Sequence, residues 1–152
     1  MAAYNVISIG EHKKYFDESS YYDVINYILN HATYFGAANI RSINSAADEM
    51  LNAAIAFNKN KGKRVRHSVL SFGAWENVTP EMANEFAQKI ILYYADRFQI
   101  VYAVHTNTDE VHIHFVMNMV SFVDGSRYDG KKADYYAFRK HMQAITHRAV
   151  LT

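Results

Sequence analysis

The stretch IVYAVHTNTDEVHIHFVMNMVSF, residues 100–122, decides the fold of this chain. An apolar run ends at His105, a polar segment covers 106–110, and a second run alternates between apolar and polar residues from Val111. Two runs of this kind around a short polar segment predict a pair of antiparallel strands. We therefore expect a β-hairpin here.

The predicted hairpin brings three histidines together. Side chains alternate between the faces of a strand, so His112 and His114 share one face with Asn118, and the opposite, apolar face is the better candidate for core packing. When the strands pair, His105 lies opposite or diagonal to the other two, with Cβ atoms about 4.5–8 Å apart. Three imidazoles at this spacing can bind one divalent metal through bonds of about 2.0–2.1 Å. The alternative is a half-exposed polar face without a ligand.

Length and composition indicate one packed domain. The chain has 152 residues, half of them hydrophobic, with 12 Tyr and 9 Phe, which is enough to bury a core. The absence of cysteine excludes disulfides and thiolate metal sites, and it suits a reducing cytoplasm. No apolar run approaches the roughly 18–20 residues of a membrane span, and we expect no secretion signal. The net charge of +1 means that nucleic-acid binding would depend on local basic clusters.

Local patterns predict the other elements. Strands are expected at 4–9 and 65–72, with a short edge strand at 127–128, and helices at 21–31, 46–57, 80–96 and 133–150. Thr79 before Pro80 is typical of a helix start. Residues 33–43 are expected to be irregular, with a turn at Gly36. This order predicts an α+β fold, an antiparallel β-sheet with helices packed mainly on one face.

These motifs resemble the nuclease domain of conjugative and mobilisation relaxases of the VirD2/MobA (MOBP-like) type, in the HUH endonuclease superfamily. That group has a histidine, an HxH pair on a following strand, and an asparagine four residues further on. The segment VINYILN, residues 24–30, resembles the motif with the nucleophilic tyrosine, here Tyr27. Further blocks of the family follow in the expected order, namely AADEMLNAA, RHSVLSF, ENVTPEMANEF and DGSRYDGKKADYYAFRKHM. The histidine and asparagine positions of the signature match His105, His112, His114 and Asn118.

The resemblance implies a single nuclease domain over 1–152 with a palm-like fold, whereas relaxases of this type usually continue into a further C-terminal region. Tyr27 would attack single-stranded DNA at the transfer origin of a plasmid or integrative element, leaving a 5′-phosphotyrosine that can be religated. The three histidines would hold Mn²⁺ or Mg²⁺, although an all-nitrogen site also suits Zn²⁺, Ni²⁺ or Co²⁺. Asn118 would support the ligands. Relaxosome accessory and coupling proteins would be partners, in the bacterial cytoplasm and without a membrane.

Two departures from the family pattern concern the histidines. The family often has HxDxxHxHxH, and this chain has Asn107 in place of the acid and Glu110 in place of the first histidine of the run. The missing acid leaves open what orients the imidazoles, because a ligating histidine usually donates its second N–H to a carboxylate or carbonyl. Glu110 is either an additional ligand or a loop carboxylate. Glu76 matches a commonly acidic position, and it would orient a ligand or accept the tyrosine proton, or be a surface acid.

Other residues keep alternatives open. Tyr21, Tyr22 and Tyr34 lie near Tyr27 in the sequence and are alternative nucleophiles. Replication initiators and transposases of the HUH superfamily carry the tyrosine on a helix after the histidine strand, where this chain has Tyr135 and Tyr136. A catalytically inactive DNA- or protein-binding module is a third reading. The basic segment 59–66 is either a solvated loop or a phosphate contact. Our candidates for DNA contact are Lys63, Arg64, Arg66, Arg127, Lys131 and Lys132.

Overall fold

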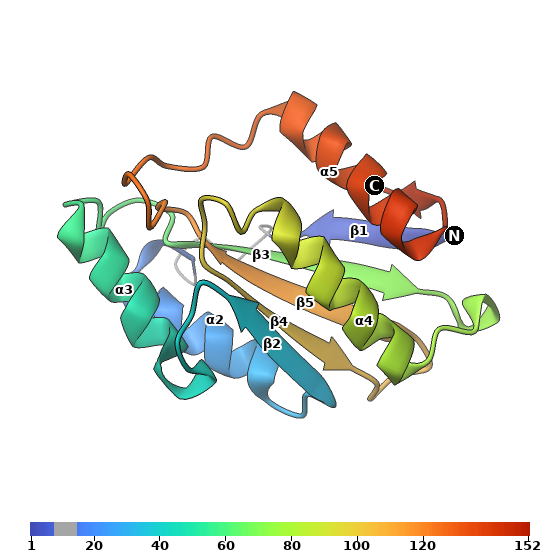
Figure 1. Cartoon of the computed structure of the whole chain (residues 1–152). Helices are drawn as coiled ribbons and strands as arrows, with labels where there is room; N and C mark the ends of the chain where they lie inside the picture. Colours follow the sequence, from blue (N-terminus) through green and yellow to red (C-terminus); the bar gives the residue numbers. More distant parts are fainter. Residues whose placement is uncertain (8–14) are drawn as a thin grey trace.

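The computed structural model describes residues 1–7 and 15–152. Within this part, a six-stranded sheet is combined with four α-helices (Figure 1). The strand order is β2-β4-β5-β3-β1-β6, in which only the β1–β6 pair is parallel. The strands are β1 (Ala2–Val6), β2 (Tyr34–Ala38), β3 (Val65–Phe72), β4 (Ile100–His105), β5 (Val111–Asn118) and β6 (Val150–Leu151). The helices are α2 (Ser20–Leu29), α3 (Ala46–Ala56), α4 (Pro80–Ile90) and α5 (Lys132–Thr146).

The predicted hairpin is confirmed as β4 and β5, which lie side by side within the sheet. In its register His105 is the direct partner of His112, and Ala103 is the partner of His114. On its other side β5 pairs with β3, which covers the predicted residues 65–72. Two flanking strands therefore hold β5 along its whole length, which makes the hairpin a rigid support for its side chains.

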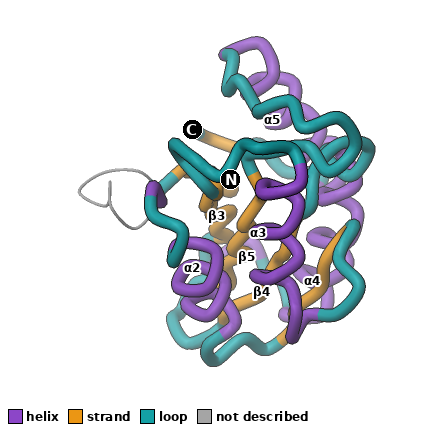
Figure 2. The backbone as a smooth tube through the Cα atoms, turned by 90° about the vertical axis from the view of Figure 1, so that its left-hand side faces the viewer, coloured by secondary structure: helices purple, strands orange, loops and turns teal. Residues whose placement is uncertain are grey.

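Both faces of the sheet are covered by helices. Val101, Ala103 and Val116 pack with α2 and α3 on one face, whereas Tyr102 and Phe115 belong to the core under α4 and α5 on the other. Figure 2 shows α2 and α4 on opposite sides of the strands. The α+β class is confirmed, and the helices are divided between the two faces rather than gathered mainly on one. The physical reason is that the central strands are apolar on both faces and need a layer on each.

The segment 33–43 is not irregular, because residues 34–38 form the edge strand β2 paired to β4. Gly36 lies within this strand and not in a turn. It faces Tyr102, and a Cβ atom at Gly36 would lie 2.5 Å from Cε2 of the Tyr102 ring. Glycine usually weakens a strand, so its presence misled the local prediction. Here it marks a close approach of the backbone to an aromatic side chain.

The ends of the other strands and helices differ in detail from those expected from the sequence. The first strand begins at Ala2 and ends at Val6, and residues 8 and 9 of its expected range lie outside the described residues. Thr79 caps α4 by accepting a hydrogen bond from the Met82 amide at 3.1 Å, but the helix ends at Ile90 and continues as a 3₁₀ turn. The last helix ends at Thr146, after which the chain forms β6. Residues 127–128 contribute one isolated bridge, between Arg127 and Val120.

A membrane-spanning helix is not found in the described part of the chain, where each helix is too short or too polar for that role.

Candidate metal centre

The hairpin gathers three imidazoles on the face of the sheet that α2 covers. One ligand atom from each of His105, His112 and His114 lies within 4.8 Å of the other two. His105 and His114 are buried, and His112 is half-buried at the mouth of the cluster. The ring centroids of His105 and His114 are 4.4 Å apart. The predicted convergence of the three side chains is therefore present in the fold.

Backbone carbonyls orient two of these rings. His105 donates from Nε2 to the carbonyl of Ile28 at 2.5 Å, and His112 donates from Nδ1 to the carbonyl of Glu110 at 2.9 Å. Ile28 lies in the last turn of α2, where carbonyls have no partner within the helix. Because a carbonyl only accepts, these two nitrogens carry the protons. The lone pairs are then on Nδ1 of His105 and Nε2 of His112, which are the atoms that can bind a metal.

The third ring is oriented by a histidine that sequence reasoning missed. His67 Nε2 lies 2.9 Å from His114 Nδ1, and His67 Nδ1 lies 3.1 Å from the hydroxyl of Tyr15. For His114 to offer a lone pair from Nε2, its Nδ1 must donate to His67, which must in turn donate to the Tyr15 oxygen. A signal was available in RHSVLSF, since His67 stands two positions from Val69, the partner of His114, on the same face of β3.

The two buried imidazoles of the cluster, those of His105 and His114, favour the neutral form. Burial, followed by repulsion from nearby imidazoles with His67 first, lowers the pKa of His114 to about 3. Burial also lowers the pKa of His105. A neutral imidazole is the form that binds a metal. Two ligands on one ion are at most about 4.2 Å apart, twice the bond length, so small side-chain rotations suffice for the three nitrogens to converge. The donor set therefore fits a divalent transition metal.

Tyr27 lies beside this cluster. Its ring centroid is 6.0 Å from that of His67 and 6.2 Å from that of His114, both in edge-on orientation. The side chain is 53% exposed, because the apolar stripe of α2 that contains Val24 and Ile28 packs against the sheet and leaves Tyr27 at the margin. The same helix thus presents a tyrosine to the cluster and a carbonyl to His105.

The alternative tyrosines are placed differently. Tyr21 is fully buried, while the hydroxyls of Tyr22 and Tyr34 donate to the carboxylates of Asp48 at 2.5 Å and Glu81 at 3.2 Å. Tyr135 and Tyr136 belong to α5, on the face of the sheet opposite the histidines. Of the tyrosines considered from the sequence, Tyr27 is the one whose ring is near two imidazoles of the site.

Asn118 and Glu76 have structural partners. Asn118 is buried and donates from Nδ2 to the Met50 carbonyl at 3.1 Å and to Gln99 Oε1 at 2.9 Å, which ties α3 to the end of β5. The buried Glu76 carboxylate forms an ion pair with Arg148 at 2.8 Å and a second one with the amine of Met1. No contact joins either residue to the histidines within 1–7 and 15–152. Their expected roles at the site stay predictions.

The two departures from the family pattern lie on the exposed loop between β4 and β5. Glu110 contributes its backbone carbonyl to His112, while its exposed side chain is not part of the ligand cluster found among the described residues. Asn107 is exposed on the same loop. The acid that is missing at position 107 is thus not needed to orient the rings, because Ile28, Glu110 and His67 supply the partners.

The predicted DNA-contact residues divide into three groups. Arg64 donates to the backbone carbonyl of Phe16 at 2.7 Å, and Arg127 donates to that of Lys63 at 2.6 Å. Arg66 is buried and Lys63 is half-buried, and both line a pocket on the face opposite the histidines. Lys131 and Lys132 are exposed at the start of α5, where Lys131 lies 3.8 Å from Asp129. Contact with DNA stays a prediction for all six.

Comparison with known proteins gives consistent matches. A family model described as "Relaxase: MobA/VirD2-like, nuclease domain" matches residues 27–151. The group II intron-interrupted relaxase LtrB of Lactococcus lactis subsp. cremoris is 28% identical over 74 residues, which cover 48% of this chain and 13% of the relative. Protein rlx of Staphylococcus aureus is 28% identical over 102 residues, which cover 62% of this chain and 32% of the relative. The chain thus spans a third or less of these curated relatives.

Proposed function

Because the chain belongs to the MobA/VirD2-like relaxase nuclease domain family, we propose that it nicks one strand of DNA through attack by Tyr27 beside a histidine-bound divalent metal. The observation that carries the proposal is the position of the Tyr27 ring, 6.2 Å from that of His114, next to three imidazole ligand atoms within 4.8 Å of one another. The DNA site that we propose is a transfer origin, single-stranded at the cut.

The chemistry follows from the groups at the site. A tyrosine hydroxyl has a pKa near 10 and is a weak nucleophile at neutral pH. A bound Mn²⁺ or Mg²⁺ would supply charge neutralisation on the non-bridging oxygens of the scissile phosphate. Tyr27 Oη forms a bond to phosphorus and gives up its proton, while the bond to the 3′-oxygen breaks and that oxygen takes a proton. The product is a 5′-phosphotyrosine and a free 3′-hydroxyl.

The same geometry suits strand rejoining. The phosphotyrosine keeps the energy of the phosphodiester, so a 3′-hydroxyl that returns to the site can reverse the step. Tyr27 is half-exposed, and this exposure leaves room for a strand of DNA. The role of His105, His112 and His114 is to hold the ion, whereas His67 keeps His114 in the tautomer that can bind it.

The two alternative functions predict different outcomes. A replication initiator or transposase would use Tyr135 or Tyr136, but α5 lies on the face of the sheet away from the histidines. An inactive DNA-binding module would have the fold without metal binding. The ordered partners of the three imidazoles favour a working metal site over that reading.

The test is to incubate the protein with single-stranded oligonucleotides from candidate transfer origins, with Mn²⁺ or with EDTA, followed by denaturing gels and intact-mass analysis. We expect a metal-dependent adduct that maps to Tyr27. The Tyr27→Phe variant should form none and retain its fold, and Tyr22→Phe is the matched control that should react normally. An adduct at Tyr135 or Tyr136 would contradict the assignment, and the absence of both adduct and Mn²⁺ binding would favour the inactive module.

A further inference from the structure

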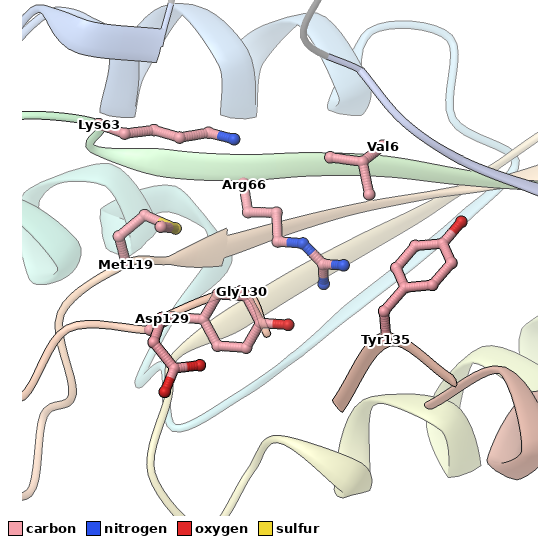
Figure 3. A pocket seen from close by; sticks show the side chains of 8 residues that line it. Val6, Lys63, Arg66, Met119, Asp129, Gly130 and Tyr135 are labelled. Atoms are coloured by element: carbon pink, nitrogen blue, oxygen red, sulfur yellow. The ribbon is translucent and has the colours of Figure 1, made fainter. Parts of the chain in front are cut away.

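A pocket lies on the face of the sheet opposite the histidines. Its volume is about 240 Å³. Figure 3 shows Arg66 projecting from β3 into this pocket, with Met119 and Tyr135 on either side of it. Along β3 the side chains alternate, so Arg66 points away from the face that carries His67. The pocket is therefore separate from the candidate metal centre. Its lining consists of Val6, Lys63, Arg66, Met119, Tyr128, Asp129, Gly130 and Tyr135.

Two cations line this pocket without a carboxylate partner. Arg66 is 7% exposed and Lys63 is half-buried, and neither forms an ion pair within 4.0 Å among the residues that the structure describes. Burial, followed by repulsion from Arg66, lowers the pKa of Lys63. Bringing like charges together in a partly dry site is costly unless an anion compensates them. The arrangement therefore favours an anionic ligand.

The nearby carboxylates offset these cations only in part. Burial raises the pKa of Asp134, but hydrogen bonds from three tyrosines, followed by the charge of Arg66, lower it overall. Asp134 accepts hydrogen bonds from the hydroxyls of Tyr128 at 2.6 Å, Tyr94 at 2.8 Å and Tyr93 at 3.0 Å. Asp129 is exposed at the rim and lies 3.8 Å from the Lys131 ammonium. Both acids thus have other partners, and among the described residues neither forms an ion pair within 4.0 Å with Arg66 or Lys63.

The walls of the pocket are aromatic and apolar. The Arg66 guanidinium lies 5.1 Å from the ring centroid of Tyr128, and Tyr135, Val6 and Met119 complete the lining. A guanidinium held against an aromatic ring keeps a planar, bidentate set of donors that matches phosphate oxygens. Tyrosine faces also accept a planar base by stacking.

We propose that this pocket is a second, metal-independent site that binds a phosphate group attached to a planar ring, as found in a nucleotide. Arg66 and Lys63 contact the phosphate, and the tyrosines receive the ring. The site goes beyond the proposed nicking activity, since it lies on the other face of the sheet and needs neither Tyr27 nor the histidines. Its ligand is either a free nucleotide or one nucleotide of a DNA strand, which share this chemistry.

The test is calorimetric titration of the full chain in EDTA with thymidine 3′,5′-bisphosphate, inorganic phosphate and thymidine. We expect saturable binding of the bisphosphate, weaker binding of phosphate, and none of thymidine. Lys63→Met and Arg66→Lys should each weaken bisphosphate binding about tenfold or more, because a charge or the bidentate fork is lost. Lys89→Met removes an exposed lysine of α4 and should leave it unchanged.

The outcomes separate the readings. Lack of saturable bisphosphate binding by the wild type would overturn the proposal. It would also be overturned if Lys89→Met weakened bisphosphate binding as much as Lys63→Met, because the effect would then come from the overall charge of the protein and not from the pocket. If a thermal melt shows that Arg66→Lys is not folded, the affinity of Lys63→Met for the bisphosphate alone tests the proposed site. Competition between the bisphosphate and an oligothymidylate identifies a DNA strand as the source of the ligand, and its absence identifies a free nucleotide. Because EDTA is present, failure here is distinct from failure of the metal-dependent adduct.

Discussion

His67 Nε2 lies 2.9 Å from His114 Nδ1, and both imidazoles are buried between β3, β5 and α2. The two rings are stacked with centroids 5.1 Å apart. His67 is therefore the partner that orients a candidate metal ligand. A positioning residue of this kind acts on metal affinity through the ring that it holds.

Replacing His67 by Ala should weaken Mn²⁺ binding about 10- to 100-fold, because His114 loses the acceptor that selects its metal-binding tautomer. His67→Gln should restore part of the affinity, since its amide oxygen can accept from His114. Isothermal titration with Mn²⁺ measures both. His147→Asn, at an exposed histidine with φ 56° that asparagine tolerates, is the control. Wild-type affinity in a folded His67→Ala protein would contradict the positioning role.

The free energy of unfolding of the metal-free protein should decrease as the pH drops below 6.5. The pKa of His114 is about 3 in the folded chain against 6.5 ordinarily, so between these values the unfolded state binds a proton that the folded state does not. Stability is then full above pH 6.5 and is lost at up to about 1.4 kcal/mol per pH unit as the pH decreases. Urea denaturation in EDTA at pH 7 and pH 5 should show a loss about 2 kcal/mol larger for the wild type than for His114→Gln. An identical pH dependence of the two proteins would refute this account.

Glu76→Gln should lower stability and leave nicking intact. The substitution removes the charge that pairs with Arg148 at 2.8 Å in a buried setting, and we expect a loss of about 1–3 kcal/mol in the free energy of unfolding. Denaturant titration and the rate of the Tyr27 adduct measure the two effects. Glu81→Gln, on the exposed side of α4, is the matched control and should change stability little. A stable Glu76→Gln protein that forms no adduct would instead support the catalytic role expected from the sequence.

Gly36→Ala should destabilise the fold by about 1–3 kcal/mol, because the new methyl group would overlap the Tyr102 ring. The ring has little freedom to move, since its hydroxyl donates to Asn84 Oδ1 at 2.5 Å. Thermal or urea unfolding measures the effect. Phe35→Thr, at an exposed position of the same strand, should change stability by under about 0.5 kcal/mol. Equal stability of Gly36→Ala and the wild type would show that the edge strand adapts.

The local sequence pattern was sufficient to predict an element where its residues alone determine the structure. The alternation of residues 111–118 predicted β5 and the shared face of His112 and His114, because period-two patterning depends only on strand geometry. Thr79 and Pro80 predicted the start of α4 for a similarly local reason. The family resemblance added Tyr27, which periodicity alone did not separate from its neighbours.

Local pattern failed where a distant partner decided the outcome. The strand β2 contains Gly36, and what makes it a strand is its pairing to β4 across some 65 residues of chain. The two-residue strand β6 exists through its parallel pairing with β1 at the other end of the chain. Both segments are short edge elements, whose hydrogen bonds come from neighbours that a local window does not contain.

The sequence by itself determined the candidate ligand set, since the spacing of His105, His112 and His114 in a hairpin brings their side chains together whatever surrounds them. The tertiary structure decided what orients them. The Ile28 carbonyl comes from α2, and the His67 ring from β3, 77 and 47 residues away from their partners. A tautomer depends on the hydrogen bond at the far nitrogen of each ring, and such a bond is formed only when the sheet and its helices have packed.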